Sequence, residues 1–176
     1  MRTIALLCVL AVAACATGPT YEAANNSAFI AANYAAADRL ANVLKANGQD
    51  GPFIVATFAN VDNLEQSSRL GRTLSEQIGS RLVQAGFQVI EVKLRNNVFV
   101  SNARQGDFLL SRELRDISAN HKVNTVVVGT YSDANEYLYV TVKAVTLQSG
   151  TVTASHDYAL PMLPAVRAML LPPNTR

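Results

Sequence analysis

The first fifteen residues constrain the chain most strongly, because they determine in which compartment the rest of it must fold. Arg2 gives a positively charged start, residues 4–13 are apolar, and small alanines directly precede Cys15. A positive segment, an apolar segment and a small-residue cleavage site are the three parts of a secretory signal peptide. The apolar run is shorter than the ~20 residues that a transmembrane helix needs. The sequence therefore predicts export and removal of residues 1–14.

The cysteine at the cleavage site predicts a lipid anchor. Val12-Ala13-Ala14-Cys15 resembles the lipobox of bacterial lipoprotein signal peptides, which implies diacylglycerol attachment at Cys15. Two or three acyl chains anchor a protein far more firmly than one. The alternative is an ordinary secretory signal in which Cys15 is incidental. Asp after the cysteine commonly signals inner-membrane retention, whereas this chain has Ala16, so we expect an outer-membrane anchor and a periplasmic domain.

Removal of the signal peptide changes the chemistry available to the chain. Cys8 leaves with the signal and a lipidated Cys15 has no free thiol, so the mature domain has no disulfide and no cysteine nucleophile. Without Arg2, fourteen of the fifteen Lys and Arg residues remain against thirteen Asp and Glu residues. This near-neutral charge argues against nucleic acid as a partner, since nucleic-acid-binding domains are usually strongly basic. Nothing in the sequence indicates a cofactor.

The mature chain divides into a short tether and one domain. Residues 15–25 are expected to be the lipidated cysteine and its tether, and the ten residues after Cys15 span at most roughly 33 Å. Residues 26–176 then form a single domain with its core in residues 52–160. Removal of 14 of the 176 residues leaves 162, a length that suits one hydrophobic core.

Two segments in the first half have the apolar spacing of amphipathic helices. Residues 26–46 are rich in alanine, the best helix former. A second helix is expected after a polar loop at residues 60–68. Asp62 and Glu65 have the spacing of a capping box for its start, and Gly86 permits a left-handed cap at its end.

A third helix and five strands complete the predicted fold. The helix is expected after Asp107, with Leu110, Leu114 and Ile117 on one face. The strands are apolar or alternating runs bounded by turn residues, at 53–58, 87–94, 123–131, 136–147 and 151–160. The order of elements predicts one α/β (α+β) domain. It has a mixed five-stranded sheet with an antiparallel C-terminal meander and about three helices packed on it.

No arrangement of catalytic or metal-binding residues stands out. Ser155-His156-Asp157 contains triad residue types, but neighbouring side chains on a strand point to opposite faces and cannot line up. His121 lies where its charge would favour a helix C-terminus. A pair such as Glu113 and Asp133 could serve a glycan hydrolase, but nothing in the sequence favours it. We therefore predict no catalytic residue, no metal site and no enzyme activity.

A polar cluster beside the first predicted strand could hold a ligand. Asn60, Asp62 and Asn63 follow that strand, and open α/β sheets bind ligands at such places. The alternative is loop and cap chemistry, which already accounts for each of the three residues.

The predicted strand at 136–147 is a second candidate for binding. Its apolar side chains include Tyr137, Tyr139, Val140 and Val142. As an edge strand it could accept a strand from a partner. Ordinary core packing is the alternative, because burial of every second residue explains half of these side chains.

A characteristic motif runs through the middle of the chain. It reads TFANVDNLEQSSRLGRTLSEQIGSRLVQAGFQVIEVKLRNNVFV, followed by GDFLLSREL. This pattern resembles the core of the FlgO family, outer-membrane lipoproteins associated with the polar flagella of Gram-negative bacteria. The motif residues that carry the resemblance are Asn60, Asp62, Asn63, Gly71, Arg72, Glu76, Gln77, Ser111 and Arg112.

The resemblance implies a non-enzymatic lipoprotein required for flagellar motility. Its implied partners are flagellar outer-membrane or basal-body-associated proteins, with homo-oligomer formation as a further option. The implied fold is similar to the TolB amino-terminal domain. No catalytic residue carries over, and the motif is interpreted physically: Gly71 permits close packing, and Arg72 with Glu76 forms an i,i+4 pair. The alternative is a TolB-like periplasmic binding lipoprotein that activates or scaffolds a cell-wall enzyme.

Overall fold

The computed structural model describes residues 20, 24, 27–64, 68–90, 99–101, 108–110 and 120–171. Its named helices are α2 (Ala28–Ala46), α3 (Arg69–Gln84) and α5 (Pro164–Leu170). Its strands are β1 (Phe53–Val55), β2 (Ala59–Asn60), β3 (Val89–Ile90), β4 (Phe99–Ser101), β5 (Phe108–Leu110), β6 (Thr125–Ala134), β7 (Tyr137–Thr146) and β8 (Val152–Pro161).

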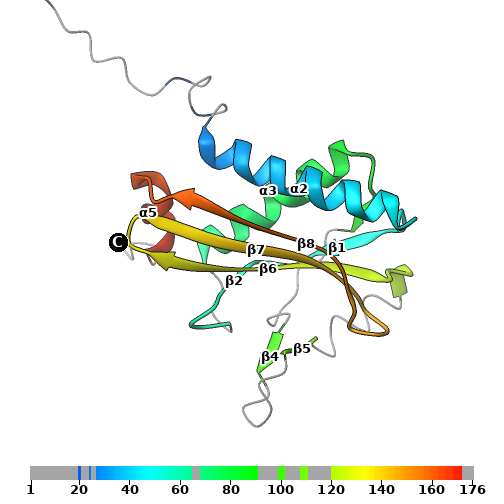
Figure 1. The fold of residues 1–176 in the computed structure, drawn as a ribbon. Coiled ribbons are helices and arrows are strands. Elements are labelled where there is room, and N and C mark those ends of the chain that lie inside the picture. Colours follow the sequence, from blue (N-terminus) through cyan, green and yellow to red (C-terminus); the bar gives the residue numbers. More distant parts are fainter. Residues whose placement is uncertain are drawn as a thin grey trace, which may run out of the picture.

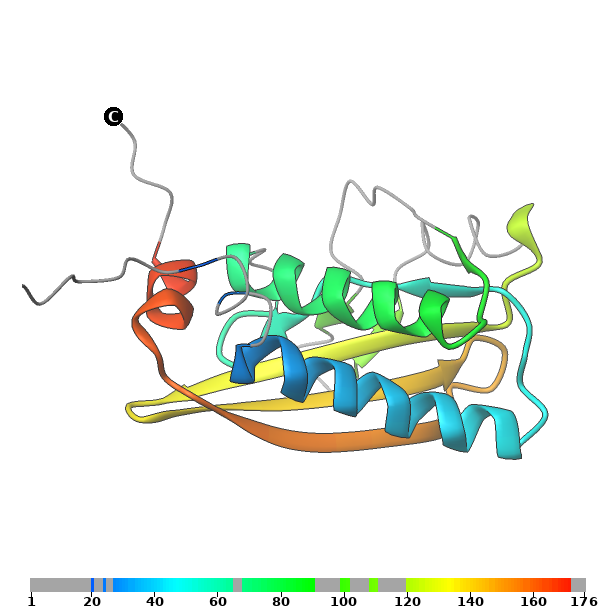
Figure 2. The ribbon, with the colours of Figure 1, turned by 90° about the horizontal axis from the view of Figure 1, so that it is seen from above.

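The described strands form one large mixed sheet and one small antiparallel pair. The large sheet has the order β3-β1-β6-β7-β8, and the short β2 pairs with β6 as a sixth strand. β1 runs parallel to both β3 and β6, whereas β6, β7 and β8 form an antiparallel meander. Helices α2 and α3 lie over one face of the sheet, and α5 lies at one end (Figures 1 and 2). The predicted single-domain α+β architecture is confirmed.

Several predicted elements differ from those in the structure. The first predicted strand ends at Val55, because Phe58 turns toward α3 and its N–H donates to the carbonyl oxygen of Gly71. The second predicted strand is described only as β3, and residues 91–94 lie outside the described residues. The prediction of a helix at Leu110 is wrong, because this residue pairs with Phe99 in the β4–β5 pair.

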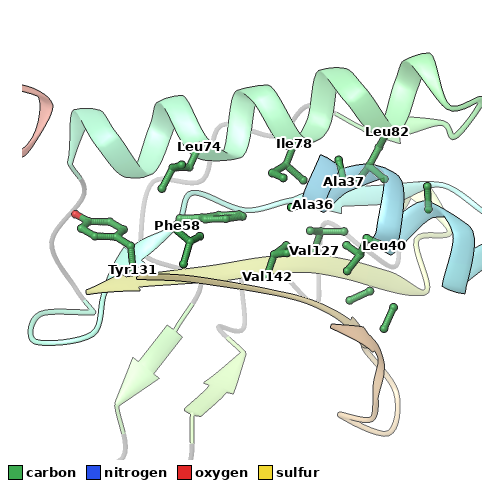
Figure 3. Close-up of a cluster of buried hydrophobic side chains, with 14 of the residues drawn as sticks. Ala36, Ala37, Leu40, Phe58, Leu74, Ile78, Leu82, Val127, Tyr131 and Val142 are labelled. Carbon is green, nitrogen blue, oxygen red and sulfur yellow. The ribbon is translucent and has the colours of Figure 1, made fainter. Parts of the chain in front are cut away.

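The core is built between the sheet and the two long helices. The four-residue apolar spacing in α3 forms its buried face, and none of its side chains contacts solvent: Leu70, Leu74, Ile78 and Leu82. In α2 the small side chains of Ala36 and Ala37 are equally buried, which lets the helix approach the sheet closely. Figure 3 shows Leu74, Ile78 and Leu82 of α3 and the two alanines of α2 packed over Val127 and Val142 of the sheet. A smaller cluster on the other face contains Ile54, Ala56, Val123, Val126 and Val128.

Polar contacts join the outer sides of the two helices. Asp38 of α2 accepts two hydrogen bonds from the guanidinium of Arg81 in α3, at 2.8 and 2.9 Å. The hydrogen bond to Asp38 raises the pKa of Arg81. Lys45 donates to the carbonyl oxygen of Ala85 at the end of α3. These contacts are solvent-exposed, so they orient the helices more than they stabilise them.

Phe58 is fully buried, and two glycines allow neighbouring elements to approach its ring and its backbone closely. A Cβ atom at Gly129 of β6 would lie 2.3 Å from the Phe58 ring. A Cβ atom at Gly71 of α3 would lie 2.0 Å from the Phe58 carbonyl oxygen. Both distances are far below contact distance, so the close approach of α3, β6 and the segment after β1 depends on both glycines.

We expect Gly129→Ala to destabilise the domain by about 1–3 kcal/mol, because the added methyl group overpacks the Phe58 ring. Phe58→Leu in the same chain should recover part of that loss, since the clash is with the Phe58 side chain. Gly71→Ala should show no such recovery, because its clash is with the backbone. Chemical denaturation of Gly129→Ala and Gly71→Ala, each with and without Phe58→Leu, and of Phe58→Leu alone measures these differences.

The matched control is Gly51→Ala, since a Cβ atom at Gly51 would have no neighbour within 4 Å. It should change the free energy of unfolding by no more than about 0.5 kcal/mol. Equal stability of the Gly129→Ala and Gly51→Ala variants would contradict the tight enclosure of Phe58.

Candidate interaction surface

The start of α3 is fixed by a serine that the sequence analysis did not single out. The Ser68 hydroxyl oxygen accepts the N–H of Gly71 at 2.8 Å, and this makes Ser68 the N-cap. Tyr131 of β6 donates its O–H to the same oxygen at 2.6 Å. Burial raises the pKa of Tyr131. The predicted capping box that starts at Asp62 is therefore wrong, because the helix begins six residues later.

The polar cluster after β2 is a compact turn. The Asp62 N–H donates to the side-chain oxygen of Asn60 at 2.9 Å, and the Asn63 N–H donates to the Asn60 carbonyl oxygen at 3.1 Å. Asn and Asp commonly close turns in this way. Loop chemistry thus accounts for Asn60, while Asp62 and Asn63 are exposed.

Gln77 points into a polar network beneath the two helices. Asn33 of α2 is fully buried, and its side-chain NH₂ donates to the side-chain oxygen of Gln77 in α3. Tyr158 of β8 donates its O–H to the side-chain oxygen of Asn33 at 2.6 Å. Burial raises the pKa of Tyr158 well above its usual range. One asparagine thus links α2, α3 and β8.

The sequence contained a signal for this network. Asn33 lies on the apolar stripe of α2, four residues after Phe29 and three before Ala36, both of which are buried. A buried polar side chain on such a stripe needs a hydrogen-bond partner. The sequence could not identify Tyr158 as that partner, because 125 residues separate the two.

Four motif residues remain exposed and form what we call the motif surface. Asp62 and Asn63 lie on the turn after β2, and Arg72 and Glu76 lie one turn apart on the outer face of α3. Gly71 and Gln77 instead face the core. Ser111, Arg112 and the proposed lipid site Cys15 lie outside the described residues. The motif thus combines residues that face the core with residues that are exposed on the surface.

Ser155, His156 and Asp157 do not line up as a catalytic triad on β8. On β8, His156 pairs with Val142 on the helix-covered face, while Ser155 and Asp157 pair with residues of the other face. His156 stacks on Tyr158 with ring centroids 6.0 Å apart. Desolvation, together with the nearby charge of Arg39, lowers the pKa of His156. This position gives His156 a packing role.

Two searches of the described residues gave no sign of metal binding or membrane spanning. No group of three or more His, Cys, Asp or Glu side chains there could hold a metal ion. Among the same residues, no helix has the length and apolarity needed to cross a membrane. Of the carboxylate pair considered for hydrolysis, Asp133 is exposed near the end of β6, and Glu113 lies outside the described part.

The proposed edge strand is an interior strand. β7 pairs with β6 on one side and with β8 on the other, so it has no free edge for a partner strand. The core-packing alternative is correct for Val140 and Val142, which are buried. Tyr137 and Tyr139 point to the face away from the helices and are about half exposed, at 47% and 55%.

Comparison with known families identifies the chain. A family model described as FlgO protein matches residues 34–165, from the middle of α2 into α5. The chain belongs to the FlgO family. The match includes the motif surface and the hydrogen bonds of Ser68 with Gly71 and Tyr131. It also includes Gln77 and Tyr158, whereas their partner Asn33 lies one residue before the match. A search of curated proteins gave no significant match.

Several solved structures are similar to this FlgO-family chain. The LpoB C-terminal domain from Salmonella enterica has a TM-score of 0.50 and 17% identity, covering 73% of this chain and 97% of that domain. The corresponding Escherichia coli domain has a TM-score of 0.49 and 15% identity over the same shares. Lipoprotein GNA1162 from Neisseria meningitidis has a TM-score of 0.42 and 10% identity, covering 65% and 83% of the two chains. At this level of identity, the first comparison shows a common fold.

We expect Tyr158→Phe to destabilise the FlgO domain by about 1–3 kcal/mol, because it leaves the side-chain oxygen of buried Asn33 without its donor. Tyr139→Phe is the matched control, since it removes the same hydroxyl group from an exposed tyrosine. Urea denaturation of both variants gives the comparison. Equal stability of the two variants would show that the hydrogen bonds of Asn33 do not contribute to the free energy of unfolding.

Proposed function

We propose that this FlgO-family chain is an outer-membrane lipoprotein that acts as a structural or assembly accessory of the bacterial flagellum and is required for motility. The observation that carries the proposal is the family match over residues 34–165. The N-terminal pattern that ends in Cys15 supports the lipid anchor, and Ala16 supports the outer membrane. In this proposal residues 1–14 are the signal peptide, and residues 15–25 are the lipidated cysteine and tether.

The proposed mode of action is binding. The tether would hold the domain within roughly 33 Å of the membrane that carries the lipid. The domain would then present a preformed surface to a flagellar outer-membrane or basal-body-associated protein, or to a second copy. We assign this contact to the motif surface, because Asp62, Asn63, Arg72 and Glu76 are exposed and have no evident role in the core.

Cys15→Ser should release the folded domain into the periplasm and abolish motility, because the acyl chains can no longer attach. The matched control is Cys8→Ser, which changes the only other cysteine but leaves the cleavage site intact. Membrane fractionation and swimming assays measure the two effects. Full motility with a soluble Cys15→Ser protein would show that the anchor is dispensable.

Glu76→Lys should impair motility while leaving the stability of the domain within about 0.5 kcal/mol, because Glu76 is exposed on α3. Asp50→Lys applies the same charge reversal to an exposed loop outside the motif. Swimming assays and thermal denaturation together separate loss of contact from loss of fold. If the two variants swim equally well, the motif surface is not the contact.

Imaging of the flagellar base in cells tests the proposed location. Deletion of the chain should remove a ring or disk of density at the outer membrane and leave filaments absent, unstable or poorly rotating. Unchanged swimming, filaments and base would overturn the flagellar proposal. The alternative, a lipoprotein that activates or scaffolds a cell-wall enzyme, predicts instead that the chain co-purifies with a peptidoglycan synthase.

A further inference from the structure

Exposed apolar side chains gather at one end of the described structure. Five of its eight exposed large apolar residues lie at the end where β6 turns into β7, a set that we call the apolar end: Val61, Tyr137, Tyr139, Leu163 and Leu171. Single exposed residues on the surface of a protein are ordinary, but a cluster at one end indicates a contact. The remaining three are the valines Val43, Val83 and Val152.

Backbone pairing and hydrogen bonds bring these five residues to the same end. Tyr137 is opposite Pro161, the last residue of β8, and Leu163 follows two residues later. Val61 donates its N–H to the carbonyl oxygen of Tyr131 in the last part of β6. Leu171 is fixed by Arg69, whose guanidinium donates to the carbonyl oxygens of Ala168 and Leu171. The apolar end is thus a fixed part of the fold.

The start of α2 lies at this end as well. Asn47, after the last residue of α2, donates to the carbonyl oxygen of Thr153 near the start of β8, while Asn33 meets Tyr158 further along that strand. α2 therefore runs antiparallel to β8, and its first residues lie toward Pro161. Figures 1 and 2 both show the start of α2 beside α5. The chain that leads to Cys15 thus enters the domain at the apolar end.

We propose that the apolar end rests on the lipid surface that holds the anchor, so that the strands stand upright on the membrane. This inference rests on the proposed lipidation of Cys15. A tethered domain meets its own membrane repeatedly, so weak apolar contacts suffice to orient it. Tyrosine suits this position, because it places an apolar ring and a polar hydroxyl at the headgroup level.

The charges at this end indicate an apolar rather than an electrostatic contact. Arg69 and Arg167 are exposed there, but so are Asp62 beside Val61 and Asp133 and Glu136 on either side of the β6–β7 turn. Opposite charges in nearly equal number give little net attraction to anionic lipid. The orientation should therefore persist in neutral phosphatidylcholine vesicles and at high salt.

Tryptophan fluorescence tests the orientation directly, because the chain contains no tryptophan of its own. Tyr137→Trp places a probe at the apolar end, and Val152→Trp places a matched probe at the start of β8, where exposure is similar at 48%. The mature chain from residue 15 is coupled through the Cys15 thiol to a maleimide lipid in phosphatidylcholine vesicles. The vesicles contain lipid brominated near the headgroup, which quenches only nearby tryptophan.

We expect several-fold stronger quenching and a blue-shifted emission for Tyr137→Trp relative to Val152→Trp. Replacing both Leu163 and Leu171 with Asp in the Tyr137→Trp chain should reduce the quenching toward the control level. Circular dichroism checks that each chain is folded. Equal quenching of the two single probes, or stronger quenching at position 152, would overturn the proposal and leave the apolar end to a protein partner.

This test is independent of the natural modification, because the maleimide lipid supplies the anchor. Natural lipidation is measured separately, by the mass of the Cys15 peptide from the exported protein. An unmodified Cys15 would contradict the proposed anchor, whereas unquenched probes on an attached domain would contradict only the orientation.

Discussion

The close packing of Gly129 on the Phe58 ring and of Gly71 on the Phe58 backbone is the constraint on which the rest of the structure depends. Gly71 brings α3 against the segment after β1, and Gly129 leaves space on β6 for the ring. The same turn of α3 carries the hydrogen bonds of Ser68 to Gly71 and Tyr131. One small region thus fixes the start of α3 and the place where the chain leaves β1. Gly71 is therefore part of the family motif because the packing of the domain needs a glycine there.

Much of the fold could be predicted from periodic patterns along the chain. The four-residue spacing of leucines and isoleucine in α3 gave its buried face, and alternation in the last three strands gave the meander. Local patterns failed where a distant contact decided the outcome. Asp62 was expected to start a helix, but Tyr131 and Gly71 meet Ser68 instead. β7 was considered as an edge strand, but β8 covers its free side.

In the candidate site, too, exposed residues could be predicted from the sequence, whereas residues with distant partners could not. Exposure of Asp62, Arg72 and Glu76 follows from their polar character, and the motif itself identified them. The role of Gln77 could not be predicted from the motif, because its partner Asn33 lies 44 residues away on another helix. This difference decides which substitutions can test a protein that is proposed to act by binding. Substituting every motif residue would mix loss of fold with loss of contact, whereas the structure separates the two groups.

The antiparallel packing of α2 on β8 has a mechanical consequence for a domain held by its N-terminal end. In the proposed anchored form, a pull on the tether would be transmitted through the first residues of α2, which is attached to the sheet by side chains and not by a backbone ladder. Because the helix lies flat along the strand, this force shears its contacts together instead of peeling them off one at a time. The load is shared between the Asn33 hydrogen bonds and the buried Leu40 and Leu44. In the proposed anchored form, the alanine-rich helix would thus carry the load between the tether and the sheet.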